Sequence, residues 1–197
     1  ALSLGALTLH AQAAAPKSNV ILVCSGTKGC PPVPKGTQVY KSIAVGVSHA
    51  RNGDWVLVWP GTYKEAVTIQ PTAQLTSGLH VRGMNRNGVV LEGTGQSGSG
   101  VHVLGVNGTW VENMTAQHYK AGSSNGFYWT GVQGFRGSYL TAYNNGDYGI
   151  YAFDATDGIF EHSYASGSPD SAFYVGQCFP CRVVLDHVTG ELSGLGY

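Results

Sequence analysis

One spacing constrains this chain more than any other feature, because a tyrosine recurs every 23 residues. Tyr128, Tyr151 and Tyr174 each follow a small residue and an apolar residue. A second series, Phe135-Arg136, Phe160-Glu161 and Leu185-Asp186, recurs every 25 residues. A fixed period in the twenties is typical of stacked structural repeats. Short alternating apolar and polar runs, separated by Gly, Asn and Asp, indicate strands and turns. The sequence therefore predicts an all-β fold, a right-handed parallel β-helix.

The composition agrees with a solenoid that forms one domain. Glycine accounts for 29 of 197 residues and charged residues for 11%, as expected where every coil needs tight turns. Residues 1–15 combine a short apolar run with a small-x-small pattern, which indicates the remainder of a secretory signal peptide. We expect the β-helix domain to cover 16–197 and to be truncated at its C-terminal end. The segment Thr37–Ala50 is predicted to form a short helix that caps the first coil.

Charge and cysteine content restrict the partners and the compartment. The formal net charge is zero, so nucleic acid is not an expected partner. No apolar run approaches the roughly 20 residues of a membrane span, and we expect a secreted, extracellular monomer. The four cysteines form two local pairs, Cys24 with Cys30 and Cys178 with Cys181. In an oxidising compartment we expect two disulfides; a redox dithiol or half of a zinc site are the alternatives for the second pair.

Two stretches carry a family resemblance. The segment 53–69, Gly-Asp-Trp-Val-Leu-Val-Trp-Pro-Gly-Thr-Tyr-Lys-Glu-Ala-Val-Thr-Ile, resembles the opening coil of pectin-lyase-like proteins. That group includes pectinesterases, polysaccharide lyases and copper-site maturation proteins. The segments 137–154 and 162–170 are similar to secreted bacterial β-helix-repeat proteins. The resemblance covers about 37–197 and implies the fold; it implies no single reaction, because this fold carries many activities.

Motifs of the characterised enzymes are missing from the sequence. It contains no Asp-Pro-His-Asp as in mannuronan epimerases and no Gly-His-Gly or paired aspartates as in polygalacturonases. The Gln, Asp, Asp and Arg arrangement of pectinesterases is not found either. Candidate sites must therefore come from stacking, because equivalent positions in adjacent coils lie about 4.8 Å apart.

The tyrosine series predicts an outward-facing strip, since Tyr128, Tyr151 and Tyr174 alternate with inward apolar residues. Such a strip either stacks on sugar rings, as a substrate-binding surface, or stabilises neighbouring strands. The second series predicts a charged ladder of four residues, Glu112, Arg136, Glu161 and Asp186. A surface ion ladder is the structural interpretation. The adjacent carboxylates of Glu161 and Asp186 would require a cation or a proton.

Two further pairs are expected to stack. Asp147 and Asp170 either share Ca²⁺ or cap turns. His162 and His187 are interpreted as packing residues.

The functional hypothesis is a secreted β-helix that binds or processes polysaccharide or a cell-surface glycan. If it is an enzyme, we expect lyase or epimerase chemistry on an acidic glycan, which needs a cation near the uronate and a base near its C5 proton. Arg136, Glu161 and Asp186 are the candidate catalytic residues. A non-catalytic surface or adhesion solenoid is the competing hypothesis. A copper-delivery role is a third, and scarce Met and clustered His argue against it.

Overall fold

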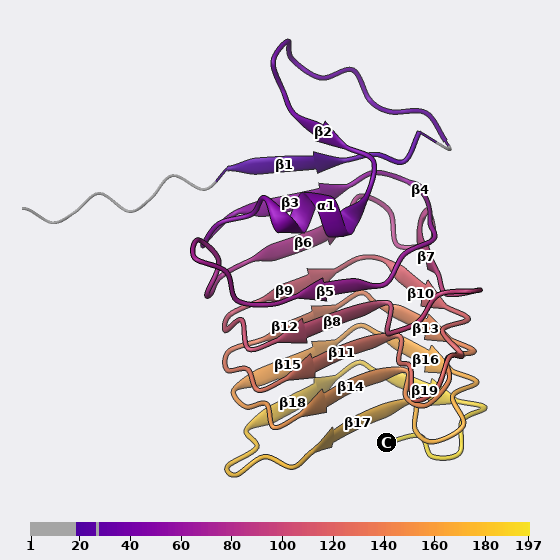
Figure 1. Cartoon of the computed structure of the whole chain (residues 1–197). Coiled ribbons are helices and arrows are strands. Elements are labelled where there is room, and N and C mark those ends of the chain that lie inside the picture. Colours follow the sequence, from indigo (N-terminus) through magenta and orange to yellow (C-terminus); the bar gives the residue numbers. More distant parts are fainter. Residues whose placement is uncertain (1–18, 27) are drawn as a thin grey trace, which may run out of the picture.

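The fold is a parallel β-helix, in a computed structural model that describes residues 19–26 and 28–197. Each complete coil contributes one strand to each of three sheets, and every strand pair is parallel. The coils follow one another down the long axis with a right-handed turn (Figure 1). The predicted fold class is therefore confirmed.

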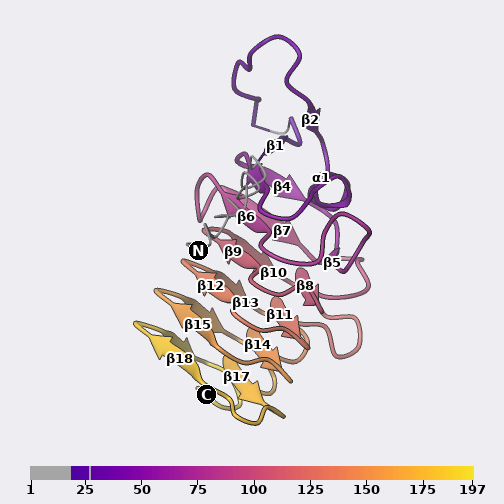
Figure 2. The ribbon, with the colours of Figure 1, turned by 90° about the vertical axis from the view of Figure 1, so that its left-hand side faces the viewer.

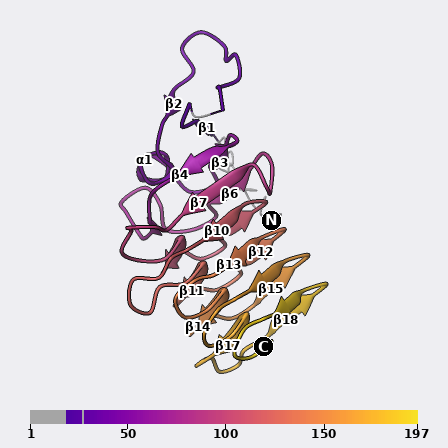
Figure 3. The same ribbon diagram turned by 90° about the vertical axis from the view of Figure 1, so that its right-hand side faces the viewer.

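Three sheets form the sides of the solenoid. The eight-stranded sheet contains, in spatial order, β18 (Val183–Asp186), β15 (Gly158–Glu161), β12 (Arg136–Ser138), β9 (Trp110–Glu112), β6 (His80–Gly83), β3 (Trp55–Val58), β1 (Val20–Val23) and β2 (Val39–Tyr40). The six-stranded sheet contains β19 (Thr189–Glu191), β16 (Tyr164–Ser166), β13 (Thr141–Tyr143), β10 (Thr115–Gln117), β7 (Val89–Glu92) and β4 (Gly61–Tyr63). The five-stranded sheet contains β17 (Phe173–Gly176), β14 (Ile150–Phe153), β11 (Phe127–Thr130), β8 (Val101–Leu104) and β5 (Val67–Ile69). The eight-stranded and five-stranded sheets occupy different sides of the stack (Figures 2 and 3).

The single helix of the described residues is shorter than predicted. Helix α1 spans Ile43–Ser48, and the preceding Val39–Tyr40 pairs as strand β2. Glu65 anchors the helix start, because its carboxylate accepts hydrogen bonds from the N–H groups of Ile43 (2.8 Å) and Ala44 (3.0 Å). The helix packs against β5, β1 and β3, while β1 and β2 continue the large sheet. Its predicted capping role stays a prediction.

The corners of the solenoid share one backbone conformation. After most strands of four successive coils, a residue with positive φ turns the chain into the next side. Between the eight-stranded and six-stranded sheets these residues are Asn113, Tyr139, His162 and His187, with φ between 47° and 59°. The left-handed region costs a residue other than Gly or Asn about 1 kcal/mol or more. The corner between the eight-stranded and six-stranded sheets thus directs a column of side chains outward, at the cost of backbone strain in its residues.

The register confirms the first predicted series and corrects the second. Tyr128 pairs with Tyr151, and Tyr151 with Tyr174. In the large sheet, however, Phe160 pairs with Gly137 rather than with the position of Phe135. A Cβ atom added to Gly158 would overlap the ring of Phe135, and one added to Gly137 would lie 2.9 Å from Phe160. Each phenylalanine therefore needs a glycine in the neighbouring coil, and the true spacing here is 23 residues.

The 25-residue spacing does hold one coil later. Glu161 pairs with Asp186, because the loop after β17 covers 177–182, whereas the loop after β14 covers 154–157. The longer loop contains the disulfide Cys178–Cys181. The second disulfide, Cys24–Cys30, is also present, so both predicted bridges are confirmed. The predicted signal peptide, 1–15, lies outside the described residues. No helix in the described part of the chain has the length and apolar character to cross a membrane.

Candidate functional site

The structure separates the predicted site residues into two groups. Tyr128, Tyr151 and Tyr174 project from the five-stranded sheet. Arg136, Glu161 and Asp186 belong to the eight-stranded sheet, which forms another side of the solenoid (Figure 2). One sugar ring therefore does not contact both groups, and each surface has to be judged by itself.

The tyrosine column is a tight stack of rings. His102, Tyr128 and Tyr151 lie 4.4 Å apart between successive ring centroids, with interplanar angles of 8° and 7°. Both faces of the Tyr128 ring are thus covered by its neighbours. Tyr148, from the turn before β14, stacks on Tyr151 at 4.4 Å. Sugar stacking needs an open ring face, so these rings offer mainly their edges.

Tyr174 differs from the other tyrosines of the column. Its ring is turned by 75° from that of Tyr151, and its atoms occupy the space that a Cβ on Gly176 would fill. Tyr174 therefore lies flat over the end of its own strand. Burial, followed by the neighbouring Tyr128 and Tyr148, raises the pKa of Tyr151. A substrate-binding role for the strip stays a prediction, and Tyr174 has the geometry that suits it best.

The outer face of the eight-stranded sheet begins with an aromatic column that the sequence pattern did not predict. Trp55 stacks on His80 at 4.3 Å, and His80 meets Trp110 edge-on at 4.4 Å. The Arg136 guanidinium follows at 5.2 Å from the Trp110 ring, a favourable cation–π distance. Burial between the two indoles lowers the pKa of His80, with an opposing effect from Glu112.

Beside this column lies the charged ladder, whose composition differs from the prediction. The residues in register are Glu112, Ser138, Glu161 and Asp186. Arg136 was expected between two carboxylates but pairs instead with Trp110 and Ile159. The cause is the two-residue error in the register of the second series. Ser138 takes the expected place of the arginine and donates its hydroxyl to Glu112 at 3.0 Å.

The arginines reach the ladder from adjacent positions. Arg136 donates from Nε to Glu161 at 2.7 Å and also from its terminal nitrogen. Arg82 lies 3.4 Å from Glu112. Glu112 and Glu161 thus each have their own guanidinium, and both are almost fully buried. Arg136 would have to leave Glu161 before it could neutralise a uronate, which limits its predicted catalytic role.

A hollow of about 360 Å³ opens at the corner between the eight-stranded and six-stranded sheets. Its lining includes Arg86, Tyr139, Ser163, Tyr164, Thr189 and the two histidines His162 and His187. The histidines and Tyr139 come from the positive-φ corner positions of successive coils. Their rings stack, with Tyr139 and His162 at 4.9 Å and His162 and His187 at 5.0 Å.

Arg86 reaches this hollow from the turn between β6 and β7. Its Nε donates to Thr141 Oγ1 (2.7 Å), and its terminal nitrogens donate to the carbonyl oxygens of His162 (3.1 Å) and Leu140. Burial lowers its pKa, but a guanidinium stays charged. Among the described residues no carboxylate pairs with it. Arg86 is therefore a half-buried cation without a counter-charge.

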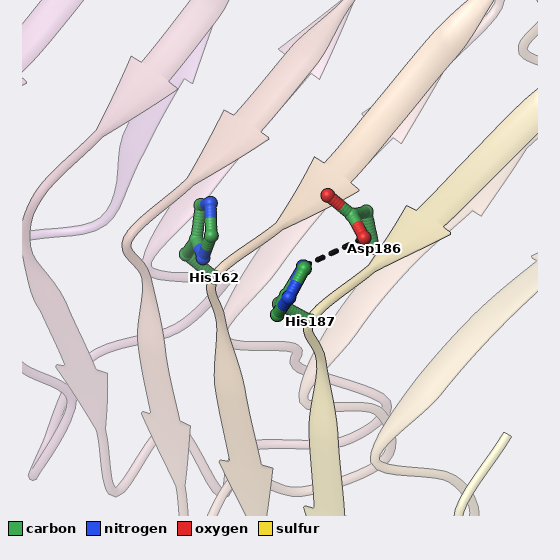
Figure 4. Close-up of side chains that lie close together, drawn as sticks. All are labelled: His162, Asp186 and His187. Atoms are coloured by element: carbon green, nitrogen blue, oxygen red, sulfur yellow. Dashed lines mark hydrogen bonds and ion pairs between the residues drawn. The ribbon is translucent and has the colours of Figure 1, made fainter.

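Asp186 connects the ladder with the hollow. Its carboxylate oxygen lies 2.7 Å from Nδ1 of His187, and His162 faces the same pair (Figure 4). Ligand-type atoms of His162, Asp186 and His187 all lie within 4.8 Å of one another. The structure thus gives a chemical neighbourhood to histidines that the sequence had suggested only as packing residues.

The other predicted pair, Asp147 and Asp170, occupies adjacent turns. The N–H of Asp170 donates to the carbonyl of Asp147 at 3.2 Å, and the Tyr148 hydroxyl donates to the Asp170 carboxylate at 3.1 Å. Burial, and then the charge of Asp170, raises the pKa of Asp147. No group of three His, Cys, Asp or Glu ligands in the described residues includes this pair. Calcium binding there stays a prediction.

A larger hollow, of about 640 Å³, lies between the loops that follow β7 and β10. His118 and Lys120 line it, and His118 lies 3.1 Å from the Glu92 carboxylate. Burial would raise the pKa of Glu92, but hydrogen bonds from Gln117, Thr94 and His118 outweigh it and lower the pKa to about 2. These bonds satisfy the carboxylate, so we assign this hollow no chemistry.

Comparisons with known proteins support the fold. No protein-family model and no curated protein sequence matches the chain. Among solved structures, a Geobacillus virus E2 protein, ORF18, aligns at 13% identity with a TM-score of 0.55 over 75% of this chain and 38% of its own. A pectin methylesterase in complex with a hexasaccharide aligns at 15% identity with a TM-score of 0.51 over 83% of this chain and 58% of its own. The chain thus shares a parallel β-helix with both and spans less than two thirds of either.

Proposed function

We propose that this protein binds polysaccharide at the corner hollow and along the adjoining outer face of the eight-stranded sheet. The observation that carries the proposal is Arg86, whose charge is held in the hollow without a carboxylate partner among the described residues. Of its five N–H donors, three are used by Thr141, His162 and Leu140. The remaining donors and the full positive charge are suited to an anionic group.

An acidic glycan is the partner whose chemistry fits best. A uronate offers a planar carboxylate that a guanidinium binds through charge-assisted hydrogen bonds. Its hydroxyls match the hydroxyls of Tyr139 and Thr189 around the hollow. The pectin methylesterase of related fold was solved with a hexasaccharide; at 15% identity that likeness supports only the suitability of the fold. The disulfides Cys24–Cys30 and Cys178–Cys181 support the proposal of a secreted protein.

Catalysis by elimination or epimerisation is the extension of this proposal. Such chemistry needs a base near the C5 proton, and His187 hydrogen-bonded to Asp186 has the form of an oriented base. Arg86, rather than the paired Arg136, would neutralise the uronate. Binding without catalysis is the alternative, and it is favoured by the closed Arg136–Glu161 pair on the adjoining face.

The test is a panel of acidic and neutral polysaccharides, with binding and the absorbance of unsaturated products followed together. We expect retention of polygalacturonate or alginate and at least a tenfold loss of binding in Arg86→Gln. The matched control is Arg182→Gln, because Arg182 is exposed and pairs with Asp157 outside the hollow. Arg86→Lys keeps the charge and should retain part of the binding. Equal binding of acidic glycan by wild type and a folded Arg86→Gln variant would refute the proposal.

A further inference from the structure

Two imidazoles and a carboxylate converge where the last two described coils turn from the eight-stranded sheet into the six-stranded sheet. His162 follows β15 and His187 follows β18, each at the residue where the chain turns with positive φ. Asp186 is the last residue of β18 and lies directly before His187. The ring centroids of the histidines are 5.0 Å apart, and the nearest ligand-type atoms of the three side chains lie within 4.8 Å of one another.

We propose that His162, Asp186 and His187 form a binding site for a divalent transition-metal ion of the zinc class. Imidazole nitrogen and carboxylate oxygen are the ligands that Zn²⁺ prefers besides thiolate. Three protein ligands with an open fourth position are the usual pattern of a solvent-accessible zinc site. Zn–N and Zn–O bonds of about 2.0–2.2 Å place tetrahedral donors roughly 3.3 Å apart. The ligand atoms of the three side chains lie within 4.8 Å of one another, and rotation of the side chains brings them to the shorter distance.

The setting of the two histidines favours ligation over packing alone. His187 is exposed and His162 is half-buried, so the burial of their rings does little to explain why histidine occupies these two positions. Two coils earlier the same corner position holds Asn113, a residue that tolerates the left-handed conformation better. Imidazoles at two successive corners therefore carry a backbone cost without a large gain in buried area. Tyr139 and Leu192 carry the same cost without an imidazole, so what distinguishes these two corners is the Asp186 carboxylate within reach of both rings.

The positive charge of Arg86 beside the site restricts which cations can bind there. Arg86 donates to the carbonyl of His162, and its positive charge opposes a second cation bound by charge alone. Hard ions such as Ca²⁺ and Mg²⁺ need several oxygen ligands, and this cluster supplies one carboxylate. An ion held by coordination to nitrogen is less sensitive to that repulsion. We therefore expect Zn²⁺ to bind and Ca²⁺ and Mg²⁺ not to compete.

The inference is tested with Zn²⁺ alone, in the absence of glycan, so its outcome does not depend on the proposed glycan binding. An ion bound by Asp186 and His187 excludes His187 as the base of an elimination, so the site goes with glycan binding rather than with that extension. Tag-free protein is treated with chelator, dialysed and titrated with Zn²⁺ by calorimetry. We expect one equivalent of Zn²⁺ to bind with a micromolar or lower Kd. His162→Ala and His187→Ala should each weaken binding at least tenfold, and the double variant should remove it. Asp186→Asn should weaken binding while keeping the shape of the side chain.

His118→Ala is the matched control, because His118 also lies beside a carboxylate, Glu92, but without a second imidazole. Its Zn²⁺ affinity should equal that of the wild type. Circular dichroism of each variant separates lost ligands from lost folding. If a histidine-to-alanine variant unfolds, His187→Gln provides the measurement. Zn²⁺ binding that is as tight in the folded double variant as in the wild type would overturn the site, and so would wild-type protein that binds no Zn²⁺.

Discussion

The five-stranded and eight-stranded sheets both carry stacked side chains on their outer faces, but the residues in the two stacks differ. On the five-stranded sheet, His102, Tyr128 and Tyr151 repeat ring upon ring, almost parallel, at 4.4 Å. On the eight-stranded sheet the residue type changes from coil to coil, from Trp55 and His80 to Arg136 beside Glu161. A ladder of like rings uses its faces on itself, whereas the mixed ladder pairs its charges along the sheet and ends at the corner with Asp186 beside His187. We infer that the first side mainly stabilises the fold and the second carries the chemistry.

The largest expected effect concerns the tyrosine side. Tyr151→Ala removes a ring that contacts Tyr128, Tyr148 and Tyr174, and it should lower the free energy of unfolding by about 2–4 kcal/mol. Urea denaturation measures the change. Tyr151→Phe keeps the ring and should cost much less. The comparison fails if Tyr151→Ala weakens glycan retention while the unfolding midpoint stays unchanged.

A smaller effect is expected on the charged side. A double-mutant cycle with Arg136→Ala and Glu161→Ala should give a coupling energy of about 1 kcal/mol, because the partly exposed guanidinium donates two hydrogen bonds to one almost fully buried carboxylate. The same cycle on Arg82 and Glu112 should give less, since their closest atoms are 3.4 Å apart and half of the Arg82 side chain is exposed. Equal coupling in both cycles would show that the closer contact adds nothing.

The smallest effect concerns Asp147, next to the tyrosine side. Its raised pKa, caused by burial and then by Asp170, means that the ionised form is disfavoured in the folded state. The penalty is absent below the unfolded pKa and complete once the pH exceeds the folded pKa, so it applies at pH 7. Asp147→Asn should therefore raise stability at pH 7 by about 0.3–1 kcal/mol, and the gain should vanish in acid.

Thermal unfolding of wild type and Asp147→Asn from pH 3 to pH 7 measures this difference. The same pair of proteins tests the predicted calcium site. If Asp147 and Asp170 share Ca²⁺, adding Ca²⁺ raises the melting temperature of the wild type and leaves that of the variant unchanged. A destabilised variant without added Ca²⁺ would contradict the pKa argument.

The sequence predicted the architecture well because strand spacing depends on loop length, and most loops keep it constant. By register the segments 131–134 and 154–157 are equivalent and equally long, so the 23-residue spacing of Tyr128 and Tyr151 continues into the large sheet as Arg136 and Ile159. The loop 177–182 is two residues longer and shifts the next spacing in the large sheet to 25. Extending that spacing backwards placed Arg136 in the wrong register. The pairing of Phe135 with Gly158 is a packing constraint that apolar periodicity does not reveal.

The candidate site was less predictable because its decisive contact lies outside the repeat. Arg86 is 76 residues from His162 and belongs to a turn without an equivalent in later coils. His162 and His187 could be aligned from their spacing, but their chemistry depends on the orientation of Asp186. Stacking predicts which residues are neighbours. It does not predict which way a corner side chain points.

The exchange of large and small residues between the coil of β12 and the coil of β15 affects how such a protein can be lengthened. Phe135 occupies space left by Gly158, and Phe160 occupies space left by Gly137. If the coil that begins at Phe135 were copied in tandem, one copy of Phe135 would face another, and no glycine would receive the ring. Insertion of a single copied coil would thus require a compensating substitution, whereas these two coils copied together would keep the phenylalanine–glycine match within the pair. The coils are alike in backbone but are not interchangeable parts.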